Sequence, residues 1–147
     1  MAPVHFATLY PVFALAGWTI LVLLWVGIKR VSAAFQGRIK PEDFAYGESG
    51  NVPPDVSLPN RNYMNLLELP VLFYVVCLVI FVTDLQTTTT LVLSWVYVAL
   101  RVIHTLIHLS YNRILHRFLA FATSNVVLFS LWVVTGLGVA AKACVSG

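Results

Sequence analysis

The chain has 147 residues, of which 59% are hydrophobic and 10% are charged, and its formal net charge is +3 at pH 7. Soluble domains carry about 25% charged residues, so this composition excludes an ordinary soluble domain. The length leaves room for one bundle of helices, and we expect no nucleic acid among its partners.

Four long apolar runs occupy about residues 9–28, 66–82, 91–109 and 118–141. Each is close to the ~20 residues that a helix needs to cross a hydrocarbon layer of ~30 Å. We therefore predict an all-α protein, an integral membrane four-helix bundle with antiparallel helices that forms a single domain over residues 1–147. The second and third helices are expected to be longer than their apolar runs, with polar ends in the interface.

The first run could be mistaken for a signal peptide because small residues follow it. No Lys or Arg precedes it, however, and the basic residues Lys29 and Arg30 come after it. This charge order is the reverse of that in a signal peptide, so we interpret the run as a retained helix.

The basic residues predict the orientation. The first connection and its end hold Lys29, Arg30, Arg38, Lys40 and Arg61, and the third holds Arg113 and Arg117. The second connection, residues 83–90, holds none. By the positive-inside rule the first and third connections are cytoplasmic, so both termini lie outside the cytoplasm. The short chain, in which we find no retention signal, favours a bacterial inner membrane.

The first connection, about residues 29–60, is the one long soluble segment that the sequence predicts. Its six Pro and Gly residues between 41 and 59 make a long helix improbable there. The segment is either a surface strap between two helices or a lid over a cytoplasmic site.

The start of the second run carries Arg61, Asn65 and Glu68, spaced 0, 4 and 7. At about 100° per residue these side chains share one helical face. A charge near the centre of a bilayer costs roughly 2.5–3.5 kcal/mol, so such residues normally face the bundle interior and pair or bind. Pro70 removes the usual donor for the carbonyl of Leu66, and we expect the helix to bend beside Glu68.

The third run carries a second polar face, formed by Arg101, His104 and His108, and Arg117 begins the fourth run. The two histidines could bind a metal ion from one helix face, but a third ligand is lacking and Arg101 would repel a cation, so we assign no metal site.

A purely structural alternative is that Arg61 reaches to the interface, Asn65 bonds a neighbouring helix and Glu68 pairs with Arg101. That alternative leaves Arg117 and both histidines unexplained. Together the residues suit a small zwitterion with excess negative charge, and glutathione fits this description. A nearby arginine favours a thiolate, which is the nucleophile.

The pattern Arg61-x-x-x-Asn65-x-x-Glu68, followed by Arg101-Val-Ile-His104-Thr105-x-x-His108 and Arg117, resembles the MAPEG family. The resemblance implies a homotrimer that holds glutathione near the cytoplasmic face, between subunits. It implies glutathione contacts at Arg30 or Lys29 and at Arg61, Asn65, Glu68, Arg101, His104 and His108. It also implies that Arg117 stabilises the thiolate.

Three positions depart from the family pattern. His108 stands where well-known members have a tyrosine, Phe118 replaces a serine, and Phe121 stands where several members have a tyrosine. The predicted function is a glutathione-dependent transferase or peroxidase that acts on lipophilic electrophiles from the bilayer, with membrane lipid as a further partner. The alternatives are a catalytically silent lipid-binding member of the family and a small four-span, proton-coupled cation exporter.

Overall fold

The computed structural model describes residues 6–146, which form helices joined by short connections. The elements are α1 (Leu9–Phe35), the 3₁₀ helix η2 (Pro41–Phe44), α2 (Pro54–Leu67), α3 (Pro70–Val82), α4 (Thr88–Leu109) and α5 (Ile114–Ser146). Four stretches within the described residues are long and apolar enough to cross a membrane, because α2 and α3 together make one span. The predicted all-α, four-span membrane fold is confirmed.

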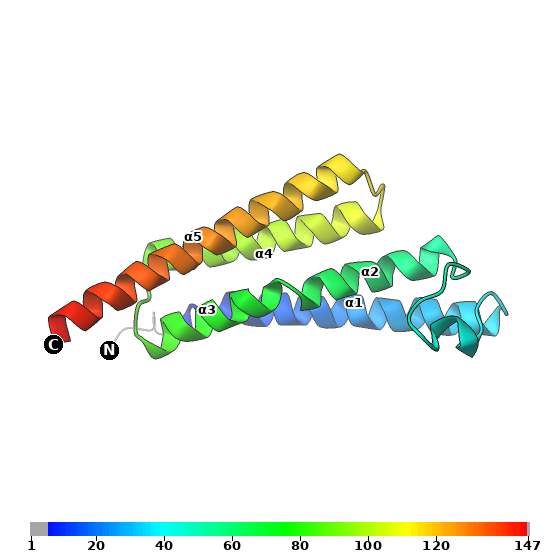
Figure 1. Ribbon diagram of the computed structural model, residues 1–147, viewed down its shortest axis with the longest axis horizontal. Helices are drawn as coiled ribbons and strands as arrows, with labels where there is room; N and C mark the ends of the chain where they lie inside the picture. The colour runs from blue at the N-terminus through cyan, green and yellow to red at the C-terminus, as the bar shows by residue number, and fades with distance from the viewer. Residues whose placement is uncertain (1–5, 147) are drawn as a thin grey trace.

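The helices are arranged in two layers (Figure 1). One layer holds α1 beside α2 and α3, and the other holds α4 beside α5. The connection between α1 and α2 and the turn between α4 and α5 lie at one end of the bundle. The connection between α3 and α4 lies at the opposite end. Successive spans are therefore antiparallel, and the first and third connections share a side.

The second span is broken where the sequence predicts a bend. Helix α2 ends at Leu67, and Glu68 has φ −80° and ψ −96°, which is not helical. Helix α3 begins at Pro70, and proline is tolerated at the first helical position because an N–H there would have no acceptor within the helix. The polar face of α2 therefore ends at this break.

The first connection is shorter than predicted, running over residues 36–53 instead of 29–60. Helix α1 continues to Phe35, beyond its apolar run, and α2 begins at Pro54. The prolines of this segment do not all exclude a helix, because Pro54 lies at the first helical position and Pro59 is accommodated inside α2. A small apolar cluster, Ala33, Ile39, Val52 and Val56, holds the connection against the helices.

The main core lies where the two layers meet. It contains Phe73 of α3 and Tyr97 of α4, whose rings stack with centroids 4.7 Å apart. Many large apolar side chains on the outside remain exposed, including Phe13 of α1 and Phe129 of α5. In a bilayer such apolar side chains can contact lipid tails, which are equally apolar, or the apolar surface of another subunit.

Candidate functional site

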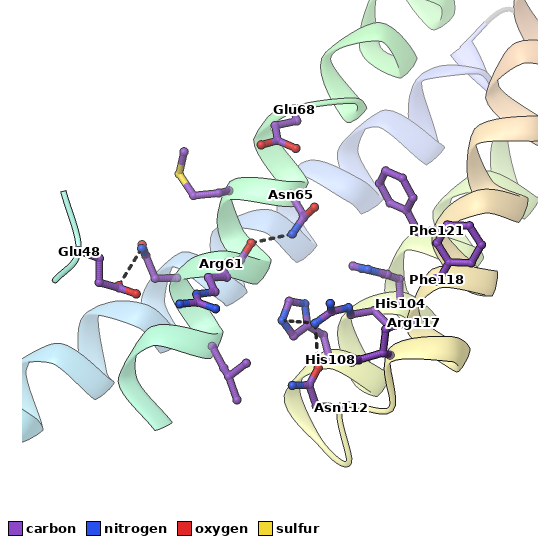
Figure 2. Close-up of a pocket in the computed structure, with 14 residues that line it drawn as sticks. Glu48, Arg61, Asn65, Glu68, His104, His108, Asn112, Arg117, Phe118 and Phe121 are labelled. Carbon is purple, nitrogen blue, oxygen red and sulfur yellow. Dashed lines mark hydrogen bonds between the residues drawn. The ribbon is translucent and has the colours of Figure 1, made fainter. Parts of the chain in front are cut away.

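A pocket of about 680 Å³ lies between α2, α4 and α5, at the end of the bundle that carries the first and third connections (Figure 2). Its lining includes most of the residues that the sequence singled out. They are Arg61, Asn65, Glu68, His104, His108 and Arg117, together with Phe118 and Phe121. Two polar helix faces, far apart in the sequence, thus meet at one cavity.

Helix α2 supplies one wall. Arg61, Asn65 and Glu68 all line the pocket, as their shared helical face predicts. The Asn65 side-chain amide donates to the carbonyl of Arg61 over 2.8 Å, which is a bond within its own helix (Figure 2). Glu68 is exposed and makes no ion pair with Arg101 in the described part of the chain. The purely structural alternative, in which Asn65 bonds another helix and Glu68 pairs with Arg101, is not what the structure shows.

The opposite wall comes from α4 and α5. His104 and His108 are buried, and their rings lie edge to face with centroids 5.8 Å apart. Arg117 Nη1 donates to Asn112 Oδ1 over 3.0 Å and lies 3.4 Å from His108 Nε2 (Figure 2). Because a guanidinium has no acceptor, His108 Nε2 must accept in this contact, and its hydrogen then lies on Nδ1.

Two predicted ligand contacts lie outside the pocket. Arg101 is fully buried, and its Nη2 donates to the backbone carbonyl of Asn65. Arg30 lies 3.7 Å from the carboxylate of Glu48 and stacks over the ring of Phe44, 4.7 Å from its centroid. The helical period places Arg101 on the polar face, but it does not say which residues of that face reach the cavity.

Sequence reasoning missed several lining residues: Glu48, Leu58, Asn60, Met64, Asn112 and Ile114. Glu48 belongs to the first connection, and its carboxylate accepts from the Asn60 amide over 3.0 Å. No periodicity points to a loop residue, so this contact could not be foreseen. Asn112 has φ +45°, and asparagine is one of the few residues that adopt this left-handed conformation readily. That preference predicts a turn, but not the bond to Arg117.

Apolar side chains also line the pocket. Phe118, Phe121 and Ile114 come from α5, and Met64 comes from α2. The cavity therefore offers cations, imidazoles and carboxylates together with apolar surface. Such a site accommodates a polar ligand beside a lipophilic one.

The described side chains of the pocket do not form a set of metal ligands. Among residues 6–146, no three His, Cys, Asp or Glu side chains come together in a way that could hold an ion. His104 and His108 are a pair without a third ligand, with cationic groups around them.

The fold defines an integral, multi-pass membrane protein, and a pocket with many polar lining residues lies between its helices. Residues 8–137 match the MAPEG family, and the chain belongs to that family. No curated protein and no solved structure matches the chain. The family gives the protein a general role in glutathione or lipid metabolism, and its members generally use glutathione. It also argues against the cation-exporter alternative.

Proposed function

We propose that the pocket binds glutathione and activates its thiol for attack on lipophilic electrophiles that enter from the bilayer. The observation that carries this proposal is the Arg117 guanidinium, which lines the same cavity as Arg61, Glu68 and the apolar Phe118 and Phe121. An enzyme that joins a charged thiol to a lipophilic acceptor needs this combination of a cation, an anionic-ligand site and an apolar surface.

The charges of the lining suit the ligand. Glutathione has two carboxylates and one ammonium group, and Arg61 is the exposed cation on α2 that a carboxylate can reach. Glu68 suits the ammonium better than Glu48 does, because Glu48 already accepts from Asn60 and lies beside Arg30. Asn65, His104 and His108 supply further hydrogen-bonding groups around the ligand.

Arg117 is assigned to the thiol. A guanidinium next to the sulfur favours the thiolate and lowers the pKa of the thiol, whose proton leaves to solvent. The thiolate then forms a bond to the electrophilic carbon, and the leaving group departs with its electron pair. With a lipid hydroperoxide as acceptor, the thiolate would instead attack a peroxide oxygen and break the O–O bond, which releases the lipid alcohol. A second glutathione would then react with the sulfenic acid that is formed, giving glutathione disulfide and water.

We infer that the working unit is a homotrimer. Arg61, Glu68 and Phe118 line the pocket and yet remain exposed in the single chain, so a neighbouring subunit has room to complete the cavity. The family resemblance implies the same assembly. Only a closed site would exclude water from the thiolate.

The proposed setting is a bacterial inner membrane, with both termini outside the cytoplasm. The pocket lies at the end of the bundle that carries the basic first and third connections, and the positive-inside rule makes this the cytoplasmic end. Glutathione would then enter from the cytoplasm, where it is made.

The second candidate is a lipid-binding member that does not ionise the thiol. It is favoured by Phe118 and Phe121, which replace hydroxyl-bearing residues of the family pattern and enlarge the apolar lining.

Ultraviolet absorbance distinguishes the two candidates. We expect a thiolate band to grow when the purified protein is titrated with glutathione. S-methylglutathione, which has a thioether in place of the thiol and cannot form a thiolate, should produce none. Saturable binding of glutathione without a thiolate band would favour the silent lipid-binding protein. Absence of any binding would refute both the ligand and its site.

A further inference from the structure

Helix α2 ends inside the bundle, and its end needs hydrogen-bond donors. The last four carbonyls of an α-helix, here those of residues 64–67, have no donor within the regular helix. Past the break, Pro70 has no N–H to give, while the amides of Val71 and Leu72 donate to the carbonyls of Glu68 and Leu69. The break therefore leaves several carbonyls at the end of α2 without a backbone partner from α3.

Arg101 reaches this end from the neighbouring helix. Its Nη2 donates to the carbonyl of Asn65, which is one of the four. Among the described residues, this is the one hydrogen bond that these carbonyls receive from outside α2. The side chain of Arg101 is fully buried, and its Nε and Nη1 have no hydrogen-bond partner among the described residues, so the Asn65 carbonyl is the one acceptor that the guanidinium has there.

The same guanidinium contacts all three helices around the pocket. It belongs to α4, it donates to α2, and it lies 5.7 Å from the ring centroid of Phe121 on α5. It also lies 6.0 Å from the ring centroid of Tyr97, one turn away on α4. A cation at a helix C-terminus is favoured by the helix dipole, and a cation over aromatic rings gains further stabilisation.

We propose that Arg101 is a positioning residue that caps the broken end of α2 and thereby holds Asn65 and Glu68 in the pocket wall. It acts on the ligand through these two residues and does not contact the ligand itself. The proposal deepens the function proposed above and rests on it for the ligand-binding test, but not for the test of the cap.

Hydrogen exchange in the ligand-free protein tests the cap. Arg101→Met replaces the guanidinium by an apolar side chain suited to surroundings of Tyr97 and Phe121. We expect the amides of residues 64–67 to exchange about ten- to a hundredfold faster in this variant, because a hydrogen bond to a charged group is lost. Arg101→Lys keeps the charge and a donor, so it should restore part of the protection. If Arg101→Met does not fold, the exchange rates of Arg101→Lys can be compared with those of the wild type instead.

The matched control is Thr105→Val, which removes the bond from Asn62 Nδ2 to Thr105 Oγ1, 3.3 Å long and also between α2 and α4. This control should leave exchange at residues 64–67 unchanged. The cap is refuted if neither Arg101 variant alters exchange there. It is also refuted if Thr105→Val has the same effect as Arg101→Met, because the effect would then be a general loosening of the two helices.

Ligand analogues separate positioning from contact. We expect Arg101→Met to weaken glutathione and its two monoamides, each lacking one carboxylate charge, by the same factor. Arg61→Met should instead weaken one monoamide less than the other. A loss confined to ligands with one particular carboxylate would make Arg101 a ligand contact and overturn the proposal. If wild-type protein binds no glutathione at all, the proposed function fails, while the exchange result still decides the cap.

Discussion

For single residues, the main observation is that two neighbouring side chains hold the guanidinium of Arg117, while part of the guanidinium stays available to a ligand. Asn112 and His108 each engage its Nη1, and its other guanidinium nitrogens have no protein partner in the described part of the chain. An arginine held in this way offers donors to a ligand without having to reorganise. That arrangement suits the stabilisation of a charge that appears only when the thiol ionises.

We expect Arg117→Ala to reduce the thiolate population of bound glutathione more than it reduces the affinity for glutathione. Loss of a cation next to the sulfur should raise the thiol pKa by roughly 1–3 units, which corresponds to a ten- to thousandfold smaller thiolate population near neutral pH. The thiolate absorbance and the conjugation rate should fall together, while the affinity for glutathione decreases only modestly.

Arg61→Ala is the matched variant in the same pocket. It should weaken glutathione binding and spare the reaction at saturating glutathione, because Arg61 is assigned to a carboxylate. Full turnover in Arg117→Ala would contradict the assignment and transfer the thiolate role to Arg61.

At the level of single elements, the carboxylate of Asp43 ties together the turn in the first connection. Asp43 Oδ2 accepts from the Lys40 amide over 2.8 Å, and Asp43 Oδ1 accepts from the Ser49 hydroxyl over 2.9 Å. These donors, with the Lys40 amide first, lower the pKa of the Asp43 carboxyl from its ordinary value of 3.8. Glu48, further along the same connection, fastens it to α2 and lines the pocket.

Removal of the Asp43 carboxylate should loosen this connection. A lowered pKa means that the ionised form stabilises the fold at pH values above 3.8, and that this contribution is lost as the pH falls through the lowered pKa. We expect Asp43→Ala to speed cleavage of residues 36–53 by limited proteolysis at neutral pH. The difference from wild type should shrink in acid, where pepsin can be used.

Glu42→Gln provides the control, because Glu42 is exposed in the same 3₁₀ helix and its side-chain carboxylate accepts neither the Lys40 amide nor the Ser49 hydroxyl. Equal sensitivity of the two variants would show that Asp43 has no special part in ordering the connection.

The broken span is the second feature at this scale. A continuous helix from Pro54 to Val82 would carry Glu68 in a regular helical position, whereas the break lets its backbone leave the helical conformation beside the pocket. Broken spanning helices in membrane proteins are tolerated where the freed backbone lines a cavity or is buried in protein. Both conditions hold here, since Glu68 lines the cavity and Arg101 is buried against Asn65.

At the scale of the whole molecule, the orientation in the membrane can be tested directly. A reporter fused after Gly147 should report an external location, and one inserted after Gly50 in the first connection should report the cytoplasm. The physical reason is the concentration of Lys and Arg in the first and third connections. The opposite pair of results would place the pocket at the external end and remove its access to cytoplasmic glutathione.

Assembly is the second test at this scale. Cross-linking in mild detergent should trap species of up to three subunits, because pocket residues such as Arg61 and Phe118 remain exposed in the single chain. Substituting exposed apolar residues that face a neighbour should reduce both trimers and glutathione binding. A strict monomer that still binds glutathione would contradict a site shared between subunits.

The sequence alone was enough to predict the class of the protein and most of the polar residues that line the pocket. Four apolar runs predict four membrane spans, because the hydrocarbon layer tolerates few polar side chains. This constraint can be recognised from the composition of each run. The spacing of Arg61, Asn65 and Glu68 predicts that they share one helical face, because the period of a helix depends only on neighbouring residues of the chain. These inferences need no knowledge of how the helices pack.

Which polar residues meet in the cavity became clear only from the packing of the helices. Arg101 and His104 share one face of α4, yet His104 lines the pocket while Arg101 is buried against the end of α2. Glu48 lies in the first connection, which is not a regular helix, so no periodic pattern in the sequence predicts that its side chain reaches the cavity. Contacts between segments depend on how the helices are packed and on where the chain between them runs, and neither is encoded in the spacing of neighbouring residues.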